Sequence, residues 1–118
     1  MEEFVFKKFI DFIKLNKKNL KSSKILVIGL TYKYGVSDMR NSLNLKIYNR
    51  IKKITKEAHA YDPFCKESNS ILNKYSSNFT KFDVVLFLTN GSIFKKIYKK
   101  IKSKKPGIIL DPFYYYNN

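Results

Sequence analysis

Four short predicted strands, separated by amphipathic stretches, constrain the fold of this chain more than any other feature of its sequence. They are KILVIG at 24–29, EAHAYD at 57–62, DVVLFLT at 83–89 and GIILD at 107–111. KILVIG is a continuous apolar run, which is typical of a strand that a parallel sheet buries on both faces. Apolar residues recur at helical spacing between the first two strands, from about Ser42, and between the last two, over 92–102.

This alternation of strands and helices predicts an α/β fold with a mainly parallel sheet and helices on both of its faces. An apolar stripe from Val5 to Ile13 predicts an additional N-terminal helix over residues 2–20. We expect a short helix or an irregular stretch over 68–75. At 118 residues the chain is long enough for one domain with a single modest core.

The charge of the chain is strongly positive, with a net value of +15. Such a charge attracts nucleic acid, anionic membranes or phosphorylated small molecules. Only Arg40 and Arg50 are arginines among the 24 basic residues, and the lysines are scattered from end to end. Arginine is the preferred partner of phosphate and base edges, so we interpret most of the charge as solvated helix faces and do not expect nucleic acid as the partner.

Several classes of site and location are disfavoured by the composition. Cys65 is the single cysteine, which excludes an internal disulfide, and His59 is the single histidine, which leaves too few ligands for a zinc centre. We therefore expect no metal site. No apolar run is long enough to span a bilayer, and the acidic start MEEF does not resemble a secretory signal. The sequence predicts a cytoplasmic protein without a membrane partner.

The segment GLTYKYGVSDMRNS, residues 29–42, follows the first predicted strand directly. In open parallel sheets, ligands bind at the carboxyl edge of the strands, where this segment is expected. It contains neither G-x-G-x-x-G nor a Walker lysine, so it lacks the usual dinucleotide cradle. Lys33 and Arg40 beside a helix start favour phosphate, with Asp38 as a support. A solvated loop with a local ion pair stays open as the alternative.

GLTYK, then D-x-R-x-S, and later YDPF resemble the C-terminal, UDP-binding domain of the UDP-glucose/GDP-mannose (nucleotide-sugar 6-) dehydrogenase family. The segments DVVLFLT and GIILD follow in the order of later family strands, so the likeness covers nearly the whole chain. It implies a Rossmann-like three-layer sandwich, with the end of a long connecting helix over 1–22 and the UDP-sugar-binding domain over 23–118. The matching residues are Gly29, Leu30, Thr31, Tyr32, Lys33, Asp38, Arg40, Ser42, Asp62 and Pro63.

The resemblance also implies roles for individual residues. Tyr32, Lys33 and Asp38 would bind the UDP-sugar or support its loop, and Arg40 would approach NAD. Family members oxidise the C6 alcohol of the sugar to a carboxylate in two NAD-dependent steps. The NAD domain and the catalytic cysteine of the family lie outside the region that this chain matches. We therefore expect no catalytic residue here, and binding without turnover.

The resemblance further implies a homodimer, or a partner chain that carries the NAD domain. Two other functions stay open: a stand-alone uridine-nucleotide-binding module, and a basic nucleic-acid-binding domain. We interpret Cys65 as an incidental thiol, His59 as a packed strand residue and Asp62 as a turn-shaping residue. The terminal FYYYNN is expected to be a frayed or packed tail. Many family members carry an arginine soon after the aspartate that ends the last strand. In this chain that aspartate, Asp111, is followed by Pro112 and Phe113.

Overall fold

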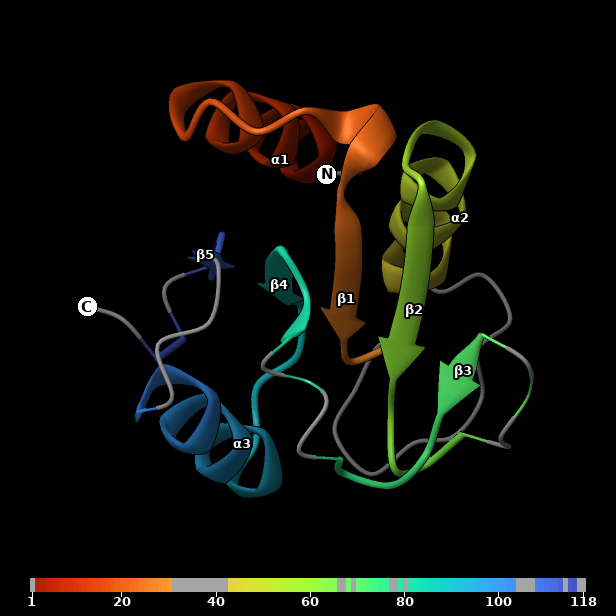
Figure 1. Ribbon diagram of the computed structural model, residues 1–118. Helices are drawn as coiled ribbons and strands as arrows, with labels where there is room; N and C mark the ends of the chain where they lie inside the picture. Colours follow the sequence, from red (N-terminus) through yellow and green to blue (C-terminus); the bar gives the residue numbers. More distant parts are fainter. Residues whose placement is uncertain are drawn as a thin grey trace.

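The computed structural model describes residues 2–30, 43–65, 68, 70–76, 79, 81–103, 108–113 and 115–116. The four predicted strands and the three predicted helices occur in the predicted order, with one further strand between the second and the third of the predicted strands (Figure 1). In order, the elements are α1 (Glu2–Leu15), the 3-10 helix η1 (Leu20–Ser22), β1 (Lys24–Ile28), α2 (Leu43–Ile54), β2 (Glu57–Tyr61), β3 (Ile71–Leu72), β4 (Val84–Phe87), α3 (Ser92–Ser103) and β5 (Ile108–Leu110).

The strands form one parallel sheet in the order β3-β2-β1-β4-β5, which confirms the predicted α/β fold. β1 lies at its centre, with Ile28 in register with both Tyr61 of β2 and Phe87 of β4. The chain moves outward from β1 through β2 to β3 and then crosses back to β4 on the other side. The order therefore reverses between β1 and β4, and ligand sites of open parallel sheets lie at such a point.

Helices cover both faces of the sheet, so the molecule has three layers. Alternate residues of β1 point to opposite faces, as expected for a strand. Ile25 and Val27 join α1 and α2 in one apolar cluster, while Leu26 and Ile28 join α3 in the other. This burial on both faces explains why the strand reads as a continuous apolar run.

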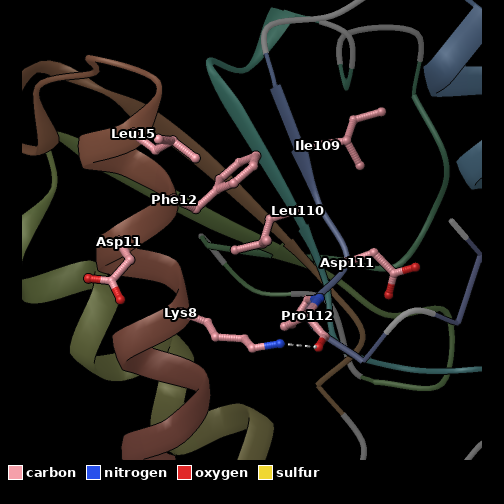
Figure 2. Close-up of a pocket in the computed structure, with 8 residues that line it drawn as sticks. All are labelled: Lys8, Asp11, Phe12, Leu15, Ile109, Leu110, Asp111 and Pro112. Atoms are coloured by element: carbon pink, nitrogen blue, oxygen red, sulfur yellow. Dashed lines mark hydrogen bonds between the residues drawn. The ribbon is translucent and has the colours of Figure 1, made fainter. Parts of the chain in front are cut away.

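The N-terminal helix is part of the core and not an appendage. Its residues Val5, Phe9 and Ile13, spaced four apart, are fully or almost fully buried against the sheet. Lys8 Nζ donates to the Pro112 carbonyl at 3.3 Å, which links α1 to the chain just after β5 (Figure 2). A cavity of about 350 Å³ lies between these two elements and is bordered by Lys8, Asp11, Phe12, Leu15, Ile109, Leu110, Asp111 and Pro112.

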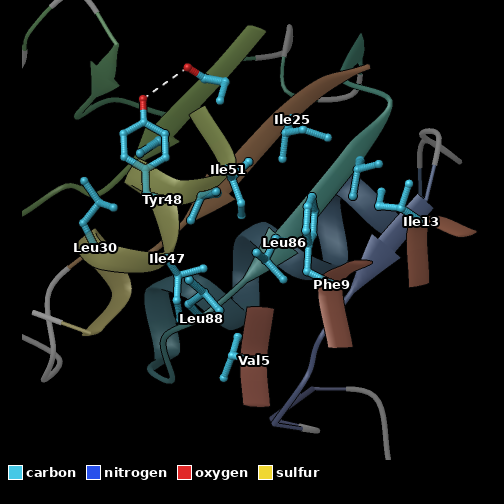
Figure 3. Close-up of a cluster of buried hydrophobic side chains, with 14 of the residues drawn as sticks. Val5, Phe9, Ile13, Ile25, Leu30, Ile47, Tyr48, Ile51, Leu86 and Leu88 are labelled. Carbon is cyan, nitrogen blue, oxygen red and sulfur yellow. Dashed lines mark hydrogen bonds between the residues drawn. The ribbon is translucent and has the colours of Figure 1, made fainter. Parts of the chain in front are cut away.

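α2 packs beside α1 on the same face of the sheet (Figure 3). Its buried tyrosine, Tyr48, donates its hydroxyl hydrogen to the Ala58 carbonyl of β2 at 3.1 Å. Arg50 holds the start of α1, because its guanidinium contacts Glu2 at 3.1 Å and Glu3 at 2.7 Å. The same guanidinium lies 3.8 Å from the ring centroid of Phe6.

The first helix ends earlier than predicted, at Leu15 and not near residue 20. Lys17 adopts a left-handed conformation with φ of 55°. The amide of Lys18 donates to the Ile13 carbonyl, and that of Lys17 donates to the Lys14 carbonyl, both at 3.0 Å. These bonds form a Schellman motif, which satisfies the last carbonyls of the helix and turns the chain. The motif was missed because its left-handed residue is a lysine and not a glycine.

The sequence also did not predict β3, which lies within the stretch expected to be a short helix or irregular. Ile71 and Leu72 pair with Ala60 and Tyr61 of β2. The amide of Asp62 then donates to the Leu72 carbonyl at 2.9 Å. Two residues are too few to show a periodicity, so only the pairing with β2 defines this strand. No helix among the described residues is long and apolar enough to cross a membrane.

Candidate functional site

The candidate site lies where the carboxyl ends of β1, β2 and β4 meet. Gly29 follows β1, and its amide donates to the Tyr61 carbonyl of β2 at 2.8 Å. On the other side, the amide of Leu88 donates to the Ile28 carbonyl at 2.9 Å. The backbone hydrogen bonds of the sheet therefore continue on both sides of β1 up to the point where the chain leaves this strand.

Gly29 occupies a position that a larger residue cannot take. Its φ is +96°, in the region that favours glycine. A Cβ at this position would lie 2.1 Å from Thr89 Oγ1 and 2.4 Å from Thr89 Cβ. The close approach of β1 and β4 at this edge thus depends on the missing side chain.

Asp62 is a fully buried carboxylate directly after β2. Its Oδ2 accepts a hydrogen bond from the amide of Leu30 at 2.9 Å, and its Oδ1 accepts one from the amide of Phe64 at 2.9 Å. The second bond spans Pro63 and forms an Asx turn, which confirms the turn-shaping interpretation. The first bond was not foreseen, and it joins the end of β2 to the chain leaving β1.

Asn44, the second residue of α2, reaches the same edge from the helix. Its Nδ2 donates to the Gly29 carbonyl at 3.1 Å, the Leu88 carbonyl at 3.3 Å and Thr89 Oγ1 at 3.2 Å. This residue is also buried. The first turn of α2 is therefore fixed against the ends of β1 and β4.

These contacts converge on one peptide group, the one between Gly29 and Leu30. Asn44 binds its carbonyl, and Asp62 binds its amide. The chain enters the segment 31–42 from this group and returns at Leu43, directly before Asn44. We call Asn44, Asp62 and the peptide that they bind the peptide clamp.

The four predicted site residues fall within segment 31–42. Tyr32, Lys33, Asp38 and Arg40 lie outside the described residues. The structure describes the residues that flank the segment, and the bond between Asn44 and Gly29 brings these flanks together at the carboxyl edge of β1. A signal for Asn44 was present in the sequence, because this amide shares its helical face with Ile47, Tyr48 and Ile51.

Cys65 lies near Asp62 but has the properties of an inert thiol. It is buried, and burial together with the charge and hydrogen bond of Asp62 raises its pKa to about 12. Almost none of it is ionised at neutral pH, and the thiolate is the nucleophilic form. This agrees with its interpretation as an incidental thiol.

His59 lies in the middle of β2 and not at the candidate site. Its Nε2 lies 2.9 Å from Glu57 Oε2, and its ring meets that of Phe82 edge-on at 5.8 Å. These contacts support its interpretation as a packed strand residue. Among the residues that the structure describes, no three acidic, histidine or cysteine side chains form a group that could hold a metal.

The C-terminal tail reaches the candidate site through Tyr116. Its hydroxyl donates to the Thr89 carbonyl at 2.5 Å, and its ring packs against Phe87 and Tyr98. Asp111 accepts hydrogen bonds from the amides of Tyr115 and Tyr116 at 3.1 and 2.7 Å. Burial, followed by the charge of Asp111, raises the pKa of Tyr116 above its ordinary value. The tail is therefore packed at Tyr116, and Asp111 holds its turn.

Comparisons with known proteins agree with this geometry. Residues 26–118 match the UDP-binding domain of the UDP-glucose/GDP-mannose dehydrogenase family. A UDP-N-acetyl-D-mannosamine dehydrogenase from Pyrococcus horikoshii is 36% identical over 101 residues, which cover 82% of this chain and 23% of that protein. One from Methanococcus aeolicus is 31% identical over 77 residues, covering 65% of this chain and 18% of that protein.

Solved structures show the same relationship. The UDP-N-acetyl-mannosamine dehydrogenase of S. aureus is similar to this chain over its whole length, with a TM-score of 0.76 and 29% identity, and 28% of that protein is covered. The UDP-D-ManNAc dehydrogenase of Pyrococcus horikoshii gives a TM-score of 0.74 and 26% identity over 92% of this chain and 26% of its own. The chain thus spans about a quarter of the length of these relatives. This chain belongs to the UDP-glucose/GDP-mannose dehydrogenase family, and it consists largely of that family's UDP-binding domain.

Proposed function

We propose that this chain binds a UDP-sugar at the carboxyl edge of β1, as the nucleotide-sugar-binding part of an NAD-dependent 6-dehydrogenase. The observation that carries the proposal is the contact between Asn44 and Gly29. It brings the first turn of α2 to the end of β1, where the strand order reverses. The positive end of a helix macrodipole at such a point favours a phosphate.

Segment 31–42 supplies the proposed ligand-binding side chains. The ammonium of Lys33 would bind the diphosphate, and Tyr32 would contact the nucleotide sugar. Asp38 would support the segment, and Arg40 would face the side from which NAD approaches. The proposed ligand is UDP-N-acetyl-mannosamine or a related UDP-sugar, because the relatives named above are dehydrogenases of that sugar.

We propose that the oxidation itself needs a further domain. NAD would accept the hydride from C6 of the sugar, and the family's cysteine would hold the intermediate. Cys65, with a pKa of about 12, does not offer the thiolate that this step requires. The chain by itself would therefore bind the nucleotide sugar without turning it over. As part of such an enzyme it would act in the cytoplasm.

The partner would be a second copy or a chain with the NAD domain. In this proposal, residues 1–22 form the connection to that partner and 23–118 form the binding domain. The exposed apolar side chains of α1 support this, since Leu15 is 81% exposed and Phe4 is 52% exposed. Leu15 and Phe12 also border the cavity between α1 and β5.

Calorimetric titration with UDP, UDP-N-acetyl-mannosamine, NAD and a DNA duplex tests the proposed function. We expect binding of both uridine nucleotides and no turnover of the sugar. Lys33→Ala should weaken UDP binding at least about tenfold, since a charge-assisted phosphate contact is lost. Lys96→Ala, which removes the same charge from an exposed position on α3, is the matched control and should leave the affinity unchanged.

The same titration separates the alternatives. Equal affinities of the protein for UDP and for UDP-N-acetyl-mannosamine would favour a uridine-nucleotide module without a role in sugar oxidation. A response to DNA alone, weakening steeply with salt, would favour the nucleic-acid-binding function and overturn the proposal.

A further inference from the structure

We propose that Asn44 and Asp62 are positioning residues for the nucleotide: by clamping the Gly29–Leu30 peptide, they set the direction in which segment 31–42 leaves the sheet. This inference rests on the proposed function for its ligand. It does not concern residues that touch the ligand. It concerns two buried side chains that hold the chain just before the proposed contact residues.

The clamp fixes the orientation of a peptide plane and not merely its position. The carbonyl of Gly29 and the amide of Leu30 point in opposite directions, and each has a side-chain partner, at 3.1 and 2.9 Å. A single bond would leave the plane free to rotate about that contact. Two bonds, one from α2 and one from the end of β2, prevent this rotation. The positive φ of Gly29 sets the direction of the backbone that leads into the peptide.

The two clamp side chains carry a desolvation cost that apolar residues at the same positions would not have. Asp62 is fully buried and Asn44 is 6% exposed, so both give up hydration. Burying a carboxylate carries a large desolvation penalty, and well-packed apolar residues often give an equal or greater stability. Polar groups of this kind specify geometry, because their bonds depend on direction whereas apolar contacts do not.

The geometry matters because the proposed ligand residues follow closely. Lys33 lies three residues after Leu30, a stretch of chain that reaches about 10 Å at most. A rotation of the starting peptide therefore moves the ammonium by several ångströms. Binding is strongest when the contact residues are held in the bound arrangement beforehand, since less ordering is needed when the ligand arrives.

Asn44 also connects the two ends of the segment. The segment begins after Leu30 and ends before Leu43, and Asn44 binds back to Gly29 across a separation of 15 residues. The same amide group contacts Thr89 Oγ1 and the Leu88 carbonyl after β4. Loss of Asn44 would therefore release both ends of the segment, whereas loss of the Asp62 bond would release only its start.

The test compares Asn44→Leu and Asp62→Asn with a control on the same helix. Asn44→Leu keeps a similar volume but removes the donor. Asp62→Asn leaves one acceptor oxygen where the carboxylate supplied two, so the side chain can no longer accept from both the Leu30 and the Phe64 amides. Tyr48→Phe is the matched control, because it removes a hydroxyl that donates to the Ala58 and Ser70 carbonyls, away from the clamp. Thermal unfolding gives the stability of each variant.

The affinity for UDP, measured by calorimetry well below the lowest melting temperature, separates positioning from stability. We expect Asn44→Leu and Asp62→Asn to bind UDP at least about tenfold more weakly than the wild type. Tyr48→Phe should bind within about twofold of the wild type even where it loses as much stability. Equal affinities of the clamp variants and the control would overturn the inference. If Asp62→Asn does not fold, Asn44→Leu decides.

Hydrogen exchange without ligand gives a readout that is independent of the proposed function. The Leu30 amide and peptides covering 31–42 should exchange at least about tenfold faster in both clamp variants than in Tyr48→Phe. Unchanged exchange overturns the inference, whatever the affinity for UDP. If the wild type does not bind UDP, the proposed function fails, and the positioning of a nucleotide by the clamp fails with it. If the wild type binds UDP and the clamp variants bind it with the same affinity as the wild type, the inference fails alone.

Discussion

Asn44 and Asp62 bind opposite ends of one peptide group, although Asn44 belongs to α2 and Asp62 directly follows β2. Asn44 donates to the Gly29 carbonyl, and Asp62 accepts from the Leu30 amide. The carboxyl edge of the central strand is thus held by side chains at the point where the backbone ladder ends. Each of the following predictions concerns a residue in this edge or in the core that supports it.

Gly29→Ala should destabilise the protein by more than about 2 kcal/mol, because the new Cβ overlaps Thr89 and the φ of +96° is unfavourable for alanine. Urea unfolding monitored by circular dichroism measures the loss. Adding Thr89→Gly should restore part of the stability, since it removes both side-chain atoms that the Cβ would meet. Adding Thr89→Ala should not, because the Cβ of Thr89 would remain 2.4 Å away. Equal rescue by both second substitutions would contradict this account.

Phe9→Ala should cost about 3–5 kcal/mol of unfolding free energy, because it empties a fully buried ring position between α1 and the sheet. Phe4→Ala on the same helix is the matched control, since Phe4 is largely exposed, and it should change stability by less than about 0.5 kcal/mol. Thermal and urea unfolding of both variants provide the measurement. Similar losses for the two variants would show that α1 does not dock as described.

Cys65 should resist thiol reagents in the folded protein. Its pKa of about 12, against an ordinary value of 9.0, leaves very little thiolate at pH 8. Labelling with iodoacetamide, followed by mass spectrometry, should therefore be slow under native conditions. It should be fast in about 8 M urea, where the chain is unfolded and the thiol is exposed. Rapid native labelling would show an accessible, ionised thiol.

The same shift predicts a loss of stability at high pH. Below pH 9 the thiol is protonated in both the folded and the unfolded chain, so its contribution to stability is fully present. As pH rises from 9.0 toward about 12, the unfolded chain loses the proton first and stability falls. Replacing the thiol by Cys65→Ala should flatten the decline of urea-unfolding free energy over this range, relative to the wild type. An identical decline would assign the effect to other groups, such as the buried tyrosines Tyr48 and Tyr61.

Tyr116→Phe should destabilise the protein by about 1 kcal/mol, because it removes the hydroxyl bond to the Thr89 carbonyl but keeps the ring. The packing against Phe87 and Tyr98 should persist in the variant. Tyr115→Phe, at a position that is 40% exposed, is the control and should have little effect. Thermal unfolding checks both. A larger loss from the control would contradict the anchoring of the tail through Tyr116.

The fold class, the order of the principal strands and helices, and the family can all be predicted from the sequence. These follow from local signals: β1, β4 and β5 are short apolar runs, α2 and α3 have helical periodicity, and GLTYK and D-x-R-x-S lie together within residues 29–42. Such signals can be seen because neighbouring residues carry them. The end of α1 and the strand β3 escaped, since a left-handed lysine and a two-residue pairing leave no periodic trace.

The contacts that build the carboxyl edge could not be predicted from the sequence. Asn44 meets Gly29 across 15 residues, Tyr116 meets Thr89 across 27, and Asp62 meets Leu30 across 32. Nothing in the local sequence states that an amide, a phenol and a carboxylate will share one edge. Their meeting results from the strand order, which brings the ends of β1, β2 and β4 together, and from burial, which requires each polar group to find a partner there.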